Sequence, residues 1–283
     1  TLPVDPVTKL ITASPLWDGG AKLKEKNAAD RTIYTVVGGL QKLFNQANVS
    51  YTDLAVADAN EAEKLINHVR GIDSYDLDED GNTTEQKDWK LGDIFHSNPI
   101  IVGEPSRFFE DVGFSGSSGF YENNKNRTKV ILVGANDGML HAFNASTGVE
   151  VWGFIPNSVL TNLQSMVSGH TYYVDSSPKV ADVWFDDNGD NQKSASEWKT
   201  VLVCGLRKGG KYYFTLDITN TLAPQFLWEF PSQNKNYDYN TMLTKVGQSW
   251  SEPAIGRVKV ESGGTLIEKW VVFIGGGFEY NSN

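Results

Sequence analysis

The chain has 283 residues, and its 40% hydrophobic and 12% aromatic content is typical of a folded globular protein rather than a disordered one. Its net charge of −10 disfavours binding to nucleic acid or anionic membranes, because both require clustered lysine and arginine. No apolar run in the sequence is long enough to cross a bilayer, and the single cysteine, Cys204, excludes an intrachain disulfide framework.

Residues 1–90 form the first of two predicted regions, which mixes strands with one helix. The stretch RTIYTVVGG, residues 31–39, is rich in β-branched and aromatic residues and ends in two glycines, so it predicts a strand and a turn. The clearest helix covers residues 58–71, because its apolar residues recur on one face. We expect Asn60 to cap this helix and Gly71 to end it in the left-handed conformation.

An acidic stretch, DLDEDGNTTE, follows the predicted helix and places three carboxylates on alternate residues before a glycine. EF-hand-type loops supply oxygen ligands to Ca²⁺ from positions 1, 3, 5, 7 and 9, with a glycine at position 6. Position 12 is Lys87, which cannot coordinate, so Glu85, Asp88 or water has to complete the site. The alternative is a solvated acidic turn. The predicted calcium ligands are Asp76, Asp78, Asp80, Asn82, Thr84 and Glu85.

Residues 91–283 form the second predicted region, in which short apolar runs end in glycines and only one weak helix is expected, near residues 157–166. A Ser-x-Pro motif recurs, and a strand ending in glycine follows each copy. The period of roughly 75–80 residues predicts propeller blades with insertions. The three copies are HSNPIIVG, SSPKVAD and WSEPAIGRV, and the strands that follow them are residues 130–134, 201–205 and 271–275.

The expected fold is therefore all-β: a partial β-propeller of about two and a half to three blades, the last one truncated, behind a short helix-containing N-terminal region. A closed ring needs about four to eight blades. We expect the remaining blades to lie in sequence outside this chain, or on a second chain that completes the propeller. Trp152, in the motif ASTGVEVW, is predicted to wedge between blades.

A second acidic stretch, residues 186–197, has the sequence DDNGDNQKSASE. Its position 6 is Asn191, which tolerates the left-handed conformation less well than glycine does. Two interpretations stay open, a second calcium site and a polar hairpin insertion between two strands. Positions 1, 3, 5, 7, 9 and 12 are Asp186, Asn188, Asp190, Gln192, Ser194 and Glu197.

No catalytic residue is predicted. The four histidines lack metal-binding spacing and are expected to be structural or exposed, and Cys204 is expected to be a small buried hydrophobic residue. The Gly-rich stretch GLRKGGKYY lies between two strands and lacks the helix and the G-K-[ST] motif of a P-loop, so it predicts a β-turn.

Taken in order, these motifs resemble the C-terminal propeller domain of the PilY family, large exported proteins of type IV pili. The similarity runs from about Trp17 to the end of the chain. It implies a modified seven-bladed, quinoprotein-like propeller at the pilus tip on the cell surface. It also implies docking on minor pilins and roles in adhesion and in pilus extension and retraction. The segments that carry it are LINHVRG, WKLGDIFHSNPIIVG, VILVGANDGMLHAFNASTGVEVWGFIP, SSPKVADVWF, TLDITN with LWEF, and WSEPAIGRV with VVFIGGGFEY.

The resemblance also implies calcium binding through a D-x-D-x-D-type loop, here the stretch that begins at Asp76. Two departures matter. Thr84 stands where such loops often have a carboxylate, and the chain has Arg70-Gly71-Ile72-Asp73 in place of the Arg-Gly-Asp of some members, so integrin binding is not inferred. The family's N-terminal adhesive half is not expected in this chain.

Two other functions remain as alternatives to a non-catalytic calcium-binding module. The stretch AFNASTGVEVW resembles quinone-dependent dehydrogenases of the eight-bladed propeller superfamily. Those enzymes usually stack the cofactor on a disulfide between adjacent cysteines, and Cys204 has no such neighbour. An outer-membrane assembly scaffold explains a propeller fold but leaves the acidic loop without a role.

Overall fold

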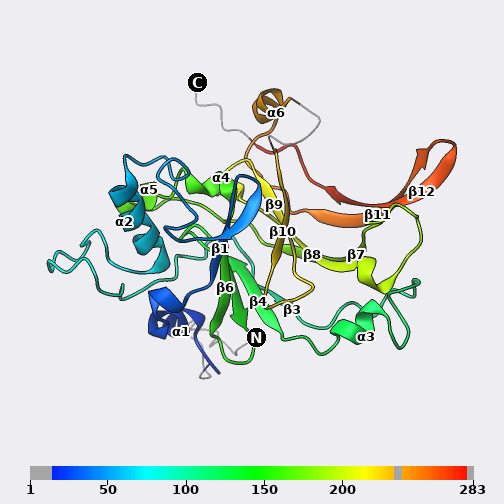
Figure 1. Cartoon of the computed structure of the whole chain (residues 1–283), viewed down its shortest axis with the longest axis horizontal. Coiled ribbons are helices and arrows are strands. Elements are labelled where there is room, and N and C mark those ends of the chain that lie inside the picture. Colours follow the sequence, from blue (N-terminus) through cyan, green and yellow to red (C-terminus); the bar gives the residue numbers. More distant parts are fainter. Residues whose placement is uncertain (1–14, 233–237, 279–283) are drawn as a thin grey trace, which may run out of the picture.

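The computed structural model describes residues 15–232 and 238–278, whose strands form two large sheets and a hairpin (Figure 1). The first sheet has the strand order β2-β1-β6-β5-β4-β3, and β3 to β6 form an antiparallel meander within it. This meander corresponds to the first predicted blade. Its strands are β3 (Ile100–Val102), β4 (Val130–Gly134), β5 (Leu140–Asn144) and β6 (Glu150–Ile155).

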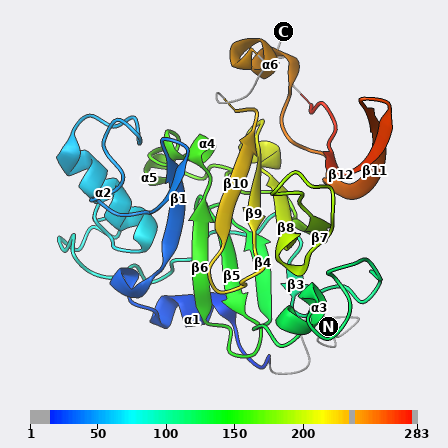
Figure 2. The same ribbon diagram turned by 45° about the vertical axis from the view of Figure 1, so that its right-hand side comes forward.

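The second sheet is also an antiparallel meander, with the order β10-β9-β8-β7, and the hairpin β11–β12 follows it. In Figure 2 the second sheet overlaps the first, with the hairpin at one edge of the molecule and α2 at the other. Each Ser-x-Pro motif precedes the first strand of one unit, so the predicted partial propeller is confirmed. The strands are β7 (Lys179–Trp184), β8 (Trp198–Gly205), β9 (Tyr213–Asp217), β10 (Gln225–Phe230), β11 (Ala254–Ser262) and β12 (Thr265–Phe273).

The main core lies between the two sheets, where apolar side chains of both blades pack together. Phe154 of β6 stacks on Phe214 of β9 with ring centroids 5.4 Å apart. Trp152 is fully buried, and its indole Nε1 donates a hydrogen bond of 2.9 Å to the carbonyl of Thr221 in the second blade. The predicted wedge between blades is confirmed. Cys204 is also fully buried, as expected for a small hydrophobic residue.

The recurring serine and glycine contact each other in the first and third units. The Ser97 hydroxyl accepts a hydrogen bond of 2.9 Å from the N–H of Gly134, and Ser251 accepts one of 2.7 Å from Gly275. A Cβ on Gly134 would lie 2.1 Å from the carbonyl oxygen of Val174, where the chain enters the second blade. Glycine is therefore required there, because the backbones approach too closely for a side chain.

The N-terminal region packs against the first blade through a strand pair. β1 (Ile33–Val37) and the turn at Gly38 and Gly39, both at positive φ, match the predicted strand and turn, and β2 (Leu40–Leu43) follows as a strand that was not predicted. β1 runs parallel to β6, so this part of the region extends the first sheet. The division of the chain at residue 90 stays a prediction.

The predicted helix is α2 (Ala59–Arg70), and its cap differs from the expectation. The carboxylate of Asp58 accepts hydrogen bonds from the N–H groups of Asn60 and Glu61, so Asp58 is the cap and Asn60 already lies inside the helix. Gly71 ends the helix with φ 115°, as predicted.

The remaining helices are short, and the weak helix expected near residues 157–166 is two separate turns, α4 and α5. No described helix is long and apolar enough to span a membrane. The α-helices are α1 (Gly19–Glu25), α3 (Phe120–Asn124), α4 (Asn157–Leu160), α5 (Ser165–Ser168) and α6 (Tyr239–Lys245), and the 3-10 helices are η1 (Ala28–Asp30), η2 (Ala195–Glu197) and η3 (Arg207–Gly209).

A buried chain of charges joins α2 to the first blade. Arg31 forms a bidentate salt bridge with Glu150, with both hydrogen bonds 2.9 Å long. Its guanidinium also donates a hydrogen bond to the carbonyl of Arg70 at the end of α2. The ring of His141 lies between Glu150 and Asp137, 2.9 Å from each. Burial opposes the charged imidazole, but the two carboxylates outweigh it and raise the pKa of His141 to about 9.

Candidate metal centre

The acidic stretch after α2 forms a closed loop whose two ends pair with each other (Figure 1). Ile72 and Gln86 form an antiparallel bridge, which brings residues 73 and 85 together across the base of the loop. The N–H of Asp73 donates to the carbonyl of Glu85 at 2.9 Å. A single short bridge therefore holds the loop at its base.

Within the loop, main-chain N–H groups turn the acidic side chains inward. Gly81 donates to the carboxylate of Asp76 at 3.0 Å, and Asn82 donates to that of Asp80 at 2.8 Å. Gly81 has φ 85°, the conformation that position 6 of an EF-hand-type loop requires. Asp76, Asp78 and Asp80 each offer a carboxylate oxygen within 4.8 Å of the others.

Asp73 is a further candidate ligand that was not predicted from the sequence. It offers an oxygen within 4.8 Å of those of Asp78 and Glu85, and its side chain is only 5% exposed. Its Oδ2 accepts a hydrogen bond from Leu77, but Oδ1 has no hydrogen-bond partner among the described residues. Asp73 stands outside the alternating pattern, so only the bridge at the base of the loop brings it to the site.

The loop carries more negative charge than it can neutralise by itself. Desolvation is the largest cause that raises the pKa of Glu85 above its ordinary value, and repulsion from the carboxylates of Asp80 and Asp78 adds to it. Burial lowers the pKa of the neighbouring Lys87 to about 8, against the attraction of Asp73. A bound cation would relieve the repulsion between the carboxylates.

The other predicted ligands of this loop lie at its exposed side. The side-chain oxygen of Asn82 accepts hydrogen bonds from the N–H and the hydroxyl of Thr84, at 3.2 and 2.9 Å. Both residues remain candidates, Asn82 through its main-chain carbonyl. A cleft of about 720 Å³ runs from the loop to the start of the first blade, and the carboxylates of Asp73, Asp78, Asp80 and Glu85 line part of it.

The second acidic stretch forms the connection between β7 and β8. Asp186, Asp190 and Glu197 offer carboxylate oxygens within 4.8 Å of one another. Asn188 lies beside them, with its amide nitrogen 3.0 Å from Asp190, and the N–H of Gln192 donates to Asp190 at 2.7 Å. The structure thus brings three of the predicted carboxylates together.

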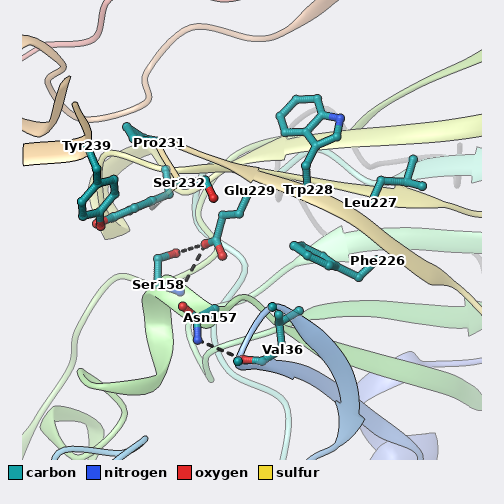
Figure 3. A pocket seen from close by; sticks show the side chains of 13 residues that line it. Val36, Asn157, Ser158, Phe226, Leu227, Trp228, Glu229, Pro231, Ser232 and Tyr239 are labelled. Carbon is teal, nitrogen blue, oxygen red and sulfur yellow. Dashed lines mark hydrogen bonds between the residues drawn. The ribbon is translucent and has the colours of Figure 1, made fainter. Parts of the chain in front are cut away.

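A third place, a cleft of about 510 Å³ between β10, α4 and the β1–β2 turn, contains one buried carboxyl group (Figure 3). Glu229 accepts hydrogen bonds from the hydroxyl and the N–H of Ser158 at the start of α4, and burial raises the pKa of Glu229. Asn157 donates to the carbonyl of Val36 at 2.9 Å. These contacts tie α4 to β10 and to the β1 strand on either side of the cleft.

Three of the four histidines are paired with acidic residues. His96 lies 2.6 Å from Asp175, His170 lies 2.9 Å from Asp93, and His141 belongs to the buried chain described above. His68 is buried, and burial lowers its pKa to about 4. No candidate metal cluster among the described residues includes a histidine.

Comparison with known proteins places these features in one family. The family model of the PilY1 beta-propeller domain matches residues 91–283. A type IV pilus biogenesis factor PilY1 homolog of Xylella fastidiosa is 33% identical over 284 residues, which cover 97% of this chain and 20% of that protein. The type IV pilus biogenesis factor PilY1 of Pseudomonas aeruginosa is 31% identical over 292 residues, which cover 94% of this chain and 22% of that protein.

A solved structure is also similar, the crystal structure of the Pseudomonas aeruginosa PilY1 C-terminal domain. Its TM-score is 0.43 at 32% sequence identity, and the match covers 64% of this chain and 32% of that one. The chain spans about a fifth of the length of the two curated relatives named above. Because the family model covers more than half of the chain and a relative is 33% identical over nearly all of it, the chain belongs to the PilY1 beta-propeller domain family.

Proposed function

We propose that this chain is a non-catalytic, calcium-binding propeller module of an exported type IV pilus biogenesis protein that acts at the pilus tip. Membership of the PilY1 family supports the link to the pilus. Calcium binding rests on one observation, the buried Oδ1 of Asp73, which lacks a partner among the described residues and belongs to a carboxylate beside Asp78 and Glu85. A buried carboxylate oxygen without a partner is costly, and a divalent cation would satisfy it.

The proposed role of calcium is to fix the junction between α2 and the first blade. The loop begins directly after Gly71 and ends at the bridge to Gln86, so ordering the loop also fixes the segment that leads into the blade. The N–H of Gly92 then donates to Asp137, which belongs to the buried chain of charges. Calcium would thus hold α2 and the blade in one arrangement.

The proposed partners are minor pilins of the pilus tip complex, and through them the module would support adhesion and pilus extension and retraction. Large apolar side chains are exposed in and just after the calcium loop, which supports a docking surface there whose shape depends on calcium. The four residues, with exposed fractions between 40% and 63%, are Leu77, Trp89, Ile94 and Phe95.

The test is the effect of calcium on thermal unfolding. We expect millimolar Ca²⁺ to raise the melting temperature of the wild-type chain. In Asp78→Ala we expect this increase to be smaller, because the contribution of this loop is mostly lost. Glu79→Gln is the matched control, because Glu79 is exposed, lies in the same loop and occupies position 4, which is not a ligand position. An unchanged shift in Asp78→Ala would reject this loop as a calcium site.

A quinone-dependent dehydrogenase and an outer-membrane assembly scaffold are the competing functions. No observation on the described residues favours either. Cys204 is the only cysteine of the chain and is fully buried, so it cannot form the disulfide on which such dehydrogenases stack their cofactor. Quinone absorbance in the purified protein would favour the dehydrogenase, whereas calcium-dependent binding to minor pilins would favour the pilus module.

A further inference from the structure

The loop between β7 and β8, residues 186–197, shares two backbone features with the acidic loop after α2, although position 1 has positive φ only in the first loop, at Asp76. Positions 4 and 6 of each loop have positive φ. In the first loop these are Glu79 and Gly81, with φ 62° and 85°, and in the second they are Gly189 and Asn191, with φ 76° and 56°. Asn191 therefore adopts the conformation for which glycine was expected, since asparagine enters the left-handed region more readily than most residues do.

The hydrogen bonds of the two loops also correspond position by position. The N–H at position 6 donates to the carboxylate at position 1, here from Asn191 to Asp186 at 3.2 Å. The N–H at position 5 donates to the side chain at position 3, here from Asp190 to Asn188 at 2.8 Å. Such bonds occur in many polar turns, so by themselves they do not show that a ligand binds.

Glu197, at position 12, provides independent evidence for a ligand. Its side chain is only 4% exposed, although it ends a loop whose other acidic residues are partly or fully exposed. Oε2 accepts hydrogen bonds from the N–H and hydroxyl of Ser194, at 3.0 and 2.9 Å, and from the indole of Trp184 at 3.3 Å. Oε1 is buried and has no hydrogen-bond partner among the described residues. A carboxylate oxygen of Glu197 lies within 4.8 Å of those of Asp186 and Asp190.

We propose that residues 186–197 form a second calcium site. The donors available are all hard oxygens, three of them from carboxylates, which favours Ca²⁺ over softer metals such as zinc or copper. The Ser194 hydroxyl already donates a hydrogen bond to Glu197, so the ligand at position 9 would be a water molecule rather than the serine oxygen. The proposed ligands are the side chains of Asp186, Asn188, Asp190 and Glu197 and the main-chain carbonyl of Gln192.

The site has a structural consequence, because Lys193 of the loop reaches two other parts of the chain. Its ammonium group lies 2.6 Å from Asp111 and 2.7 Å from Glu268 of β12. Arg257 of β11 also contacts Asp111, at 2.8 Å. Figure 1 shows the loop after β7 between α3 and the β11–β12 hairpin. Calcium in this loop would fix Lys193 and with it the position of the third-blade hairpin.

The experiment is a calcium-binding stoichiometry, measured on the whole chain by isothermal titration and by native mass spectrometry. The wild-type chain should bind two calcium ions, and Asp78→Ala should bind one. Asp186→Asn with Asp190→Asn should also bind one, and the combined triple variant should bind none. Asp187→Asn is the matched control, because Asp187 occupies position 2 and pairs with Lys199 at 2.6 Å. It should retain both ions.

Each result separates the two sites. One ion in the wild type that Asp78→Ala abolishes would overturn the second site and leave the proposed function intact. One ion that only the Asp186 and Asp190 changes abolish would support the second site and reject the first loop. Two ions retained after the changes at Asp186 and Asp190 would overturn the second site as assigned.

A variant of Glu197 adds a readout at the buried end of the site. Terbium ions replace calcium at oxygen sites and emit when a nearby indole is excited, and the indole of Trp184 bonds Glu197 directly. In the Asp78→Ala background we expect terbium emission that excess calcium quenches, and Glu197→Gln should reduce its intensity at least tenfold. Glutamine can still accept the bonds from Ser194, so circular dichroism should stay unchanged. Full emission from Glu197→Gln would contradict its role as a ligand.

Discussion

The indole nitrogen of Trp152, in the outermost strand of the first blade meander, donates a hydrogen bond of 2.9 Å to the carbonyl oxygen of Thr221 in the second blade. Trp152 is fully buried at this contact, and Thr221 is 1% exposed. The two blades are therefore joined by a polar contact inside an apolar interface, in addition to the stacking of Phe154 on Phe214.

The first prediction concerns this contact. Trp152→Phe removes the donor, leaves the buried Thr221 carbonyl without it and creates a small cavity, so we expect the free energy of unfolding to fall by about 2–4 kcal/mol. Urea denaturation at 25 °C measures this change. Trp89→Phe is the control, because Trp89 is 54% exposed and its change should stay within about 0.5 kcal/mol. Equal effects of the two changes would contradict the proposed interblade role.

The second prediction concerns the glycine at the end of β4. In Gly134→Ala the new methyl group meets the carbonyl oxygen of Val174 at 2.1 Å, so the entry into the second blade has to shift. We expect a loss of about 2–3 kcal/mol in the free energy of unfolding. Gly256→Ala, also in a strand, places its methyl group 3.6 Å from the nearest heavy atom outside its chain neighbours, the ring of Phe273, and should be tolerated. A tolerated Gly134→Ala would show that the close approach is not needed for packing.

The third prediction concerns pH. Asp137 and Glu150 face His141 and raise its pKa to about 9 against the effect of burial, whereas the ordinary value is about 6.5. The raised pKa means that the stabilisation is fully present below about pH 6.5 and is lost as the pH rises through about 9. It amounts to about 3 kcal/mol, from about 1.4 kcal/mol per unit of pKa.

Urea unfolding at several values between pH 6 and pH 9.5 measures this effect. His141→Gln lacks the titrating ring, so its free energy of unfolding should decline less over the same range. Arg31 stays charged throughout the range and does not contribute to the slope. Identical pH profiles for the wild type and His141→Gln would show that His141 does not bind a proton more tightly in the folded chain.

The fourth prediction concerns Asp73. The substitution Asp73→Asn should affect the melting temperature differently with and without calcium. Asp73→Asn keeps an acceptor for the N–H of Leu77 but removes one negative charge from the cluster. With a chelator present, we expect the variant to melt at or above the wild-type temperature, because repulsion with Asp78 and Glu85 is relieved. In millimolar calcium it should melt lower than the wild type.

The size of the calcium effect follows from mass action. A site with a dissociation constant of about 10 μM gains about 2.7 kcal/mol at about 1 mM calcium. Differential scanning fluorimetry in chelator and in calcium gives both values for each variant. If Asp73→Asn and the wild type show the same calcium-induced shift, Asp73 is not a ligand and the site is confined to the alternating carboxylates.

The sequence alone was sufficient for features that depend on local patterns. The repeat of Ser-x-Pro motifs and glycine-terminated strands predicted the blades, because each blade is built from a contiguous stretch of chain. The apolar face and the following Gly71 predicted α2, because a helix and its stop depend on neighbours a few residues away. Alternation of Asp76, Asp78 and Asp80 before Gly81 predicted that the three carboxylates gather in one loop, for the same reason, and calcium binding there stays a prediction.

Other features were decided only by tertiary structure, because they depend on groups that are distant in the sequence. The parallel pairing of β1 with β6 joins segments more than a hundred residues apart, and no local pattern encodes it. Asp73 joins the candidate site only through the bridge between Ile72 and Gln86. Glu197 matched position 12 in the sequence, but only the structure buries its side chain beside the indole of Trp184 and leaves its Oε1 without a hydrogen-bond partner among the described residues. Spacing along the chain can bring oxygens near one another, whereas desolvation by surrounding elements determines which of them requires a cation.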